Sequence, residues 1–411
     1  MKRVLLLFFL IISSSSVFSQ IVLTIEGTVV NDTIKGTSNG VSIPRSQPTI
    51  FTYRNNAITS VNTNGYMLQA GDETPGINNN NLDGEIITGN KFTWNGTNDS
   101  STTHGLFTGY NLDVVIKYNF LDKVPNGIQR KSDGMTDKSG VIAYNVIKNP
   151  KVGIVAKGMN GVKIYNNTFY SEKTSVQTYR GLIDIQANTD GGLNAISTGT
   201  KVFNNIFYTL NRTLNIKIYE PECLTGFESD YNVFWCEAGE PVFEINGSTK
   251  TFTQWQALGY DLHSVVLNPD FINLTEFVPR LRLNYGINLG ATFIKGLAIV
   301  AVWNKQNPTT TNQNGLWQVG ARIYEASASG IKINIYPNPA HDFFYVSITD
   351  STLTYQKIKI YNADGQIVLT DSIEQGSNII EIPKHLPSGI YNIALESDEL
   401  KRYVKKLIVI K

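Results

Sequence analysis

Two lysines, Lys131 and Lys157, end two short runs that read alike, Gly127–Lys131 and Gly153–Lys157. If the isoleucine of each run points into a core, the alternation of side chains along a strand turns both lysines outward. Side chains on neighbouring strands lie about 4.8 Å apart, so the two ammonium groups would repel each other. We therefore expect an anion beside them, and the candidates are Asp133, Asp184 or a bound ligand.

An insertion, Ser171–Arg180, precedes the next run of this kind, Gly181–Ile185, and ends in Tyr179 and Arg180. Loops on one side of a stack of repeats commonly border a binding surface. Tyrosine rings stack on sugar rings, whereas lysine and arginine pair with carboxylates. A face floored by the two lysines and edged by Tyr179 and Arg180 therefore suits a carbohydrate, and an acidic one better.

Other polar residues have a weaker claim on this face. The alternation that turns the lysines outward would turn Arg130 and Asp184 inward, unless the strand bends there. Three glutamates could supply the acid pair of a glycoside hydrolase, although their spacing carries no signature of one: Glu220, Glu222 and Glu228.

The elements that must position these residues come from a repeated phrase of an aliphatic residue, two others, Asn, one other and a large apolar residue. Its asparagines recur at intervals of 22 to 38 residues, a period typical of stacked supersecondary units: Asn90, Asn119, Asn145, Asn167, Asn205 and Asn232. A unit of short strands cannot bury its own apolar face and must stack on its neighbours. The repeat predicts a parallel β-helix.

In this fold, the aliphatic residue of each coil would enter one continuous core: Ile87, Ile116, Ile142, Ile164 and Val202. Asparagine suits the bend between two strands because it tolerates the left-handed region and its side chain can hydrogen-bond along the stack. We interpret the asparagines as structural. The stretch from Ile21 to about Asn80 is interpreted as the first irregular coils and a cap.

The N-terminus has the pattern of a secretory signal peptide at residues 1–19: Met1–Arg3 is positive, Val4–Ile12 is apolar, and Val17–Ser19 resembles a cleavage site. No later stretch is apolar enough to span a membrane. Aromatic residues at 11% and charged residues at 17% agree with an exported β protein, and the net charge of +1 gives no field that would attract nucleic acid.

Two cysteines, Cys223 and Cys236, stand 13 residues apart. In an exported protein this favours a disulfide, which would stabilise the fold by about 3 kcal/mol; two buried free thiols are the alternative.

The small residues 326–330 form a linker between two domains, residues 20–325 and 331–411. The second domain alternates short strands at the spacing of a small β-sandwich, with a turn at Asn362–Gly365. Its phrases Ile335–Ala340, Leu386–Tyr391 and Lys405–Val409 resemble the C-terminal sorting domain of the type IX secretion system of Bacteroidota. This resemblance implies export through the periplasm to the outer-membrane surface or the medium, with the secretion machinery as a partner.

The phrases Lys163–Tyr170, Asn268–Phe271 and Trp317–Tyr324 resemble right-handed parallel β-helix proteins of the pectate-lyase-like superfamily. Polysaccharide lyases of this superfamily remove the C5 proton of a uronate with Lys or Arg, while Ca²⁺ or Arg neutralises the carboxylate. The chemistry needs both, because the proton is acidic enough only when the carboxylate charge is neutralised. No obvious cluster of three acidic residues for Ca²⁺ is present in the sequence.

The fold expected is therefore all-β: a right-handed parallel β-helix followed by a small β-sandwich. The function expected is an exported polysaccharide-active protein, either a lyase of a uronate-containing glycan, a non-catalytic glycan-binding or adhesive protein, or a glycoside hydrolase. For the lyase, Lys131 or Lys157 would be the base and Arg130 or Arg180 the charge neutraliser, with Tyr179 and Asp184 in substrate binding. Lys131–Ser132 resembles one lyase group, but Lys157 stands where that group has Arg.

Overall fold

The structure is a computed structural model in which the chain divides into two compact units, Met1–Tyr324 and Glu325–Lys411. The predicted signal peptide, 1–19, and linker, 326–330, lie outside the residues that the structure describes. Those residues are 21–22, 28–30, 33–36, 41–43, 52–61, 63–70, 86–97, 102–109, 114–133, 140–173, 179–290, 299–302, 309–312, 317–324, 333–348, 355–374, 376–397 and 402–411.

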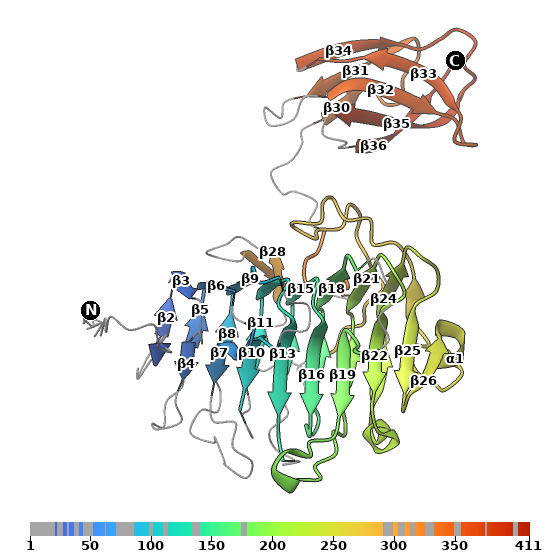
Figure 1. Cartoon of the computed structure of the whole chain (residues 1–411). Coiled ribbons are helices and arrows are strands. Elements are labelled where there is room, and N and C mark those ends of the chain that lie inside the picture. Colours follow the sequence, from blue (N-terminus) through green and yellow to red (C-terminus); the bar gives the residue numbers. More distant parts are fainter. Residues whose placement is uncertain are drawn as a thin grey trace. The chain divides into compact units, whose positions relative to one another are not determined.

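The first unit is a stack of coils whose strands form three parallel sheets, so the predicted parallel β-helix architecture is confirmed (Figure 1). From β1 to β24, each coil contributes one strand to sheet A, then one to sheet B, then one to sheet C, whereas among the described residues the last coil has no strand in sheet B. Residues of the expected irregular N-terminal cap supply β1 to β7, which continue all three sheets in parallel register.

Sheet A contains β1 (Ile21–Val22), β4 (Val41–Ile43), β7 (Tyr66–Ala70), β10 (His104–Thr108), β13 (Asn126–Lys131), β16 (Val152–Lys157), β19 (Ile183–Gln186), β22 (Leu214–Ile218), β25 (Val242–Ile245) and the antiparallel β26 (Ser248–Thr251). Sheet B contains β2 (Thr28–Val30), β5 (Thr52–Arg54), β8 (Ile86–Thr88), β11 (Val115–Lys117), β14 (Val141–Ala143), β17 (Lys163–Tyr165), β20 (Lys201–Phe203) and β23 (Glu228–Asp230). Sheet C contains β3 (Thr33–Gly36), β6 (Ala57–Ser60), β9 (Lys91–Trp94), β12 (Phe120–Asp122), β15 (Val146–Lys148), β18 (Thr168–Ser171), β21 (Ile206–Thr209), β24 (Val233–Cys236) and β27 (Val265–Val266).

Short elements lie between and after these sheets. They are the 3-10 turns η2 (Asp190–Gly192) and η3 (Pro221–Leu224), the helix α1 (Phe252–Gln256), and the antiparallel pair β28 (Ile299–Val302) and β29 (Thr309–Asn312).

The repeated phrase sets the register of the core. Its aliphatic residues align on successive strands of sheet B and are completely buried, as predicted: Ile87, Ile116, Ile142, Ile164 and Val202. Aromatic rings stack in the same way inside sheet C, where Phe169 and Phe207 lie 4.8 Å apart and nearly parallel. Because each coil buries only part of its apolar surface by itself, the stack as a whole forms one core.

The asparagines form the predicted ladder between sheets B and C. The side-chain oxygen of each accepts hydrogen bonds from the backbone and the side chain of the preceding one, as between Asn145 and Asn167 at 2.9 and 3.0 Å. The same pattern joins every step of the series, and Asn56 adds a first member. Since the ladder is buried, it satisfies polar groups that would otherwise be unpaired.

The left-handed residue of this bend is not the ladder asparagine but the residue before it. Positive φ angles occur at Tyr118, Tyr144, Asn166, Asn204 and Tyr231. The ladder position therefore requires asparagine for its hydrogen bonds rather than for its backbone conformation.

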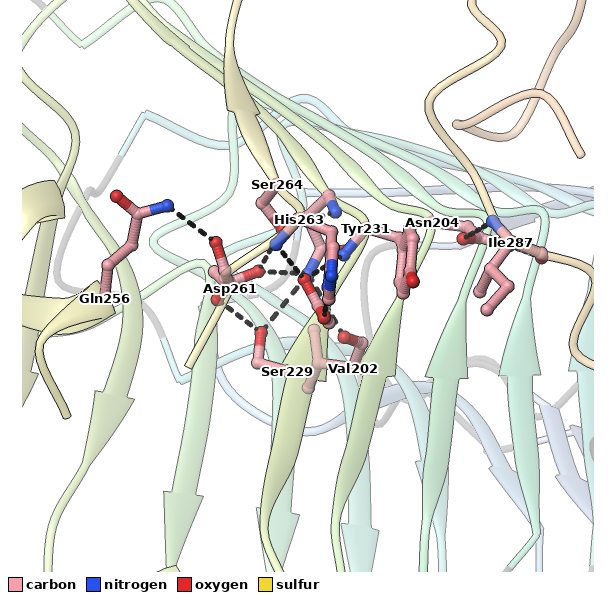
Figure 2. A network of polar contacts seen from close by, with 11 residues as sticks. Val202, Asn204, Ser229, Tyr231, Gln256, Asp261, His263, Ser264 and Ile287 are labelled. Carbon is pink, nitrogen blue, oxygen red and sulfur yellow. Dashed lines mark hydrogen bonds and ion pairs between the residues drawn. The ribbon is translucent and has the colours of Figure 1, made fainter. Parts of the chain in front are cut away.

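The ladder ends at a buried carboxylate, Asp261 (Figure 2). Its side chain accepts from Ser229 and Ser264 at 2.6 Å each, from Trp255 Nε1 at 2.7 Å and from Asn232 Nδ2 at 2.8 Å. Ser264 Oγ also accepts from the backbone of Asn232, taking the place of a further asparagine. Burial raises the pKa of Asp261 although these donors oppose the shift.

The outer faces of sheets B and C are covered by the chain that follows them. Trp317 packs on Tyr118, Tyr144 and Tyr165 outside sheet B, and Phe271 and Phe277 pack on the outer side chains of sheet C. Hydrogen bonds between side chains and the backbone fix this cover. The Asn204 side chain donates to the backbone oxygen of Ile287 and accepts from its backbone nitrogen, both at 2.9 Å (Figure 2), and Ala321 N donates to Thr168 Oγ1 at 2.9 Å. At Gly320, with φ of 86°, an added Cβ would lie 2.5 Å from Ile206.

The second unit consists of two small antiparallel sheets. One contains β30 (Ile333–Tyr336), β31 (Phe343–Ile348) and β34 (Gly376–Glu381); the other contains β32 (Tyr355–Tyr361), β33 (Ile367–Ser372), β35 (Gly389–Ser397) and β36 (Arg402–Val409). They enclose a core of their own that includes Phe344, Ile360 and Leu395. The Asn362–Gly365 turn is closed by backbone bonds, as its sequence predicts.

The predicted disulfide is not formed, because both cysteines are free and buried. Cys223 lies in η3, which follows a strand of sheet A, and contributes to the core, whereas Cys236 ends β24 in sheet C. The alternative, two buried thiols, describes the structure. Burial raises the pKa of the Cys223 thiol to about 12, so it remains protonated.

Candidate functional site on the outer face of sheet A

Lys131 and Lys157 are register partners on β13 and β16, so the predicted pairing on adjacent strands is confirmed. Both hold the same carboxylate: Lys131 Nζ lies 2.8 Å from Asp190 Oδ2, and Lys157 Nζ lies 2.6 Å from Asp190 Oδ1. The anion expected beside the lysines is thus Asp190, which is none of the candidates that the sequence favoured.

Asp190 begins η2, a turn carried by the segment between β19 and β20. Burial raises the pKa of its carboxyl, but the hydrogen bonds and charges of Lys131 and Lys157 outweigh that effect and hold the pKa below its usual value. The three side chains therefore carry two positive charges and one negative charge, and the cluster retains one net positive charge.

The structure removes Arg130 from this face. Its alternation on β13 turns it inward, as expected, and its side chain is completely buried, with Nη1 donating to the backbone oxygen of Val114 at 3.3 Å. A residue in this position cannot reach a ligand on the outer surface. The interpretation of Arg130 as a charge neutraliser is corrected accordingly.

Asp184, in contrast, belongs to the outer face. It pairs in register with Val155, and Ile154 pairs with Ile183, so the inward orientation expected from the sequence was wrong by one residue. The cause is the insertion before β19, which shifts this strand against the earlier runs. Asp184 is still completely buried, because side chains outside the sheet cover it.

The insertion supplies the main cover. Arg180 Nε lies 2.6 Å from Asp184 Oδ2, the backbone of Gly181 donates to Asp184 Oδ1 at 2.7 Å, and the Tyr219 hydroxyl lies 3.2 Å from Oδ2. Burial raises the pKa of Asp184 to about 6, although Arg180, Gly181, Tyr219 and Lys217 all act in the opposite direction. Burial also raises the pKa of Tyr219.

A second ion pair, between Lys217 and Glu244, lies on the strands that follow Asp184 in sheet A. Lys217 is the register partner of Asp184, and its Nζ lies 2.9 Å from Glu244 Oε1 on the next strand. Lys217 also donates to the backbone oxygen of Tyr179 at 3.2 Å, which ties the predicted insertion to the sheet. The Tyr179 ring is half exposed at 50% and lies under Lys151 Nζ.

Aromatic residues border the lysines on the other side. Lys131 Nζ lies 5.5 Å from the centre of the Phe107 ring, which contacts His104 and Tyr66. Burial lowers the pKa of His104 to about 4, and the charges of Lys131 and Arg180 act in the same direction.

Two of the carboxylates considered for a glycoside hydrolase, Glu220 and Glu228, have different partners. Glu220 accepts from the backbone of Ala187 at the end of sheet A, whereas Glu228 pairs with Lys201 on sheet B. Within the described residues, no three His, Cys, Asp or Glu side chains gather as a metal site would require.

Sequence reasoning missed four members of the site: Asp190, Lys217, Tyr219 and Glu244. Lys217 and Glu244 stand outside the runs that repeat clearly, and Asp190 lies in a connection without a periodic signal. Lys217 and Glu244 join the site because their strands follow β19 in sheet A. Asp190 joins it because the segment between β19 and β20 brings it to the lysines.

Comparison with known proteins identifies the second unit. Residues 334–411 match the family of secretion system C-terminal sorting domains. The chain therefore carries a type IX sorting domain. As a cargo of that secretion system, the protein is exported to the cell surface or the medium. Among the described residues, no helix is long and apolar enough to cross a membrane.

Two further likenesses are partial. Ulvan lyase NLR42 of Nonlabens ulvanivorans is 31% identical over 77 residues, 19% of this chain and 14% of that enzyme. This stretch is close in length to the sorting domain, and the chain spans only that small part of its relative. PorZ, a surface component of the type IX secretion system of Porphyromonas gingivalis, matches 21% of this chain and 12% of its own at 20% identity, with a TM-score of 0.17.

Proposed function

We propose that the exported protein binds an acidic, uronate-containing glycan on the outer face of sheet A and cleaves it by β-elimination. The observation that carries this proposal is the chelation of one carboxylate by Lys131 and Lys157, one oxygen to each ammonium group. A uronate carboxylate presents the same two oxygens.

The rest of the face fits a polymer rather than a single anion. The polar side chains extend over the five strands β13, β16, β19, β22 and β25, about 19 Å at the spacing of neighbouring strands. Tyr179 offers an exposed ring for stacking, and Phe107 borders the other end. Sheets B and C have aromatic cover over their corresponding faces, which favours sheet A as the site.

In β-elimination, one lysine as the neutral amine takes the C5 proton of the uronate, and the freed electron pair forms an enolate with the carboxylate. The other lysine neutralises the carboxylate and stabilises the enolate, with Arg180 as a further cation near the site. The C4–O bond then breaks as the enolate electron pair forms the C4–C5 double bond. The leaving oxygen takes a proton from the lysine that removed the C5 proton or from water, and an unsaturated uronate remains.

The second candidate is binding without cleavage, and one observation favours it. Asp190 pairs with both lysines as ammonium groups, which bind a carboxylate but have no lone pair to accept a proton. Catalysis would therefore require that one lysine leave this ion pair and lose its proton.

The test is the ultraviolet absorbance of an unsaturated uronate during incubation of the mature protein with polyuronates and sulfated uronate glycans, with and without Ca²⁺. For a lyase, absorbance rises with the wild-type protein and with Lys201→Met, whose lysine lies on sheet B, but not with Lys131→Met or Lys157→Met. Binding that depends on the same two lysines, without any rise in absorbance, would establish the second candidate and exclude cleavage of these substrates.

A further inference from the structure

The carboxylate of Asp190 occupies the position in which the proposed function places a ligand. We propose that Asp190 is an internal substitute for the anionic group of the glycan and leaves the lysines when a carboxylate or sulfate binds. This inference rests on the proposed function for the natural ligand, whereas the anion site itself can be tested with a simple salt.

The contacts of Asp190 show what the lysine pair accepts. Each carboxylate oxygen meets one ammonium group, at 2.8 and 2.6 Å, so the two nitrogens are spaced for two oxygens of one anion. Both lysine side chains are largely covered, with 12% and 18% exposed, whereas the side chain of Asp190 is 34% exposed. The cations are thus fixed on the sheet, and the anion approaches them from the solvent side.

The segment that carries Asp190 is fastened at its base. Asn188 and Ala195 exchange backbone hydrogen bonds of 2.7 and 3.1 Å, and Asn188 Nδ2 donates to the Ser132 backbone oxygen at 2.8 Å. Ser197 Oγ lies within 3.1 Å of the backbone oxygens of Ala156 and Gln186. These buried contacts hold the two ends of the segment against sheet A.

The tip between these ends is hydrogen-bonded to its own segment: Asp190 N donates to Asn188 Oδ1 at 3.1 Å, and Leu193 N donates to the backbone oxygen of Asp190 at 3.2 Å. None of the residues of η2 is buried, and Gly191 and Gly192 have positive φ angles of 62° and 83°. A Cβ added at Gly192 would meet no atom within 4 Å. The carboxylate is therefore held at the lysines by its two ion pairs, and it can move away without disturbing the core.

In such an arrangement a ligand binds only if it displaces the Asp190 carboxylate from the lysines. An incoming anion must replace two charge-assisted hydrogen bonds, so a carboxylate or sulfate with two available oxygens can compete, whereas a sugar hydroxyl cannot. Partly exposed ion pairs are individually weak, which permits the exchange. Removing the charge of Asp190 should open the site to anions that the wild-type protein binds poorly.

The experiment measures the binding of inorganic sulfate by calorimetry, at constant ionic strength in chloride, to the whole protein and to Asp190→Asn. We expect Asp190→Asn to bind sulfate about tenfold more tightly than the wild type, with a steeper dependence on salt concentration. Adding Lys157→Met to Asp190→Asn should abolish the gain. Glu172→Gln is the matched control and should gain nothing, because it removes the ion-pair partner of Lys148 on sheet C, whose register neighbours are Asp122 and Tyr170 rather than a second lysine.

Equal sulfate affinity of the wild type and Asp190→Asn would overturn the inference. The same titrations with an acidic oligosaccharide separate the two proposals. Tighter sulfate binding by Asp190→Asn without glycan binding by either protein would retain the anion site and refute the proposed function. Glycan binding of equal strength by both proteins would retain the function and refute the substitution of Asp190 for the ligand.

Discussion

The outer faces of sheets A and B lie on the same coils but have opposite chemistry. On sheet B, Tyr118, Tyr144 and Tyr165 are buried under Trp317. On sheet A, the corresponding coils carry Lys131 and Lys157, which are held by an anion from a surface segment. The ladder and the inward side chains build the coil in both cases, so the outward residues are free to differ. This difference underlies our proposal that the face of sheet A binds a glycan, whereas the covered face of sheet B stabilises the fold.

The largest effect is expected on the free energy of unfolding when the asparagine ladder, which supports both faces, is interrupted. Asn145→Ala should lower the free energy of unfolding by about 3 to 5 kcal/mol, because it leaves several buried partners of this ladder residue without hydrogen bonds. Chemical denaturation measures the change. The exposed Asn194→Ala should stay within about 0.5 kcal/mol of the wild type, and equal losses in both variants would refute the structural role of the ladder.

The next pair of variants compares the faces directly. Trp317→Ala should cost about 3 to 5 kcal/mol, because a fully buried indole is removed from the cover of sheet B. Lys157→Met on sheet A should cost less than about 1 kcal/mol, since it breaks one partly exposed ion pair. Unfolding curves of the two variants test this, and a larger loss for Lys157→Met would reverse the assignment of the faces.

A difference in pH dependence should separate the two aspartates on the outer face of sheet A, Asp184 on β19 and Asp190 in η2. The pKa of Asp184 is raised to about 6, so its stabilising contribution is complete below its ordinary pKa of 3.8 and is lost as the pH rises through 6. Asp184→Asn should therefore gain stability relative to the wild type between about pH 4 and pH 7, by about 3 kcal/mol at most. The gain is measured as the difference in unfolding free energy across this range.

Asp190 should behave with the opposite sign. Its pKa is lowered, so its contribution is present above pH 3.8 and is lost as the pH falls through the lowered pKa. Asp190→Asn should show no gain between pH 4 and pH 7. The same direction of change in both variants would contradict the contrast between a buried and a solvent-facing carboxylate.

The smallest effect belongs to the edge of the face. Tyr179→Ala should weaken the binding of an acidic oligosaccharide a few-fold and leave stability within about 0.5 kcal/mol, because the ring is half exposed. Tyr179→Phe, which retains the ring, should bind like the wild type. Loss of binding in the phenylalanine variant as well would assign the contact to the hydroxyl rather than to stacking.

The sequence predicted the parts of the fold that repeat. Regular asparagines and aliphatic residues identified the coils, the ladder and the neighbourhood of Lys131 and Lys157, because each depends only on the register between adjacent coils. The register of Asp184 was missed because the sequence does not show how many residues of the preceding insertion belong to the strand. Asp190 could not be predicted, since it reaches the lysines through a segment that no period constrains.

The identity of the C-terminal unit could be predicted from the sequence for a different reason. Its motifs belong to one sorting domain that recurs as a whole, so its phrases identify it without a derivation of its packing. The cysteines show the limit of spacing as evidence. A separation of 13 residues allows a disulfide-closed loop, but Cys223 lies in the turn η3 after sheet A and Cys236 lies at the end of β24 in sheet C.

The most direct test of the central claim is the affinity of the mature protein for acidic polysaccharides when the lysines of the two faces are replaced in turn. Binding to the face of sheet A predicts that the double variant Lys131→Met and Lys157→Met loses at least about tenfold in affinity, as expected when two charge-assisted contacts are removed, while Lys201→Met on sheet B binds like the wild type. Undiminished binding by the double variant, or an equal loss with Lys201→Met, would contradict it.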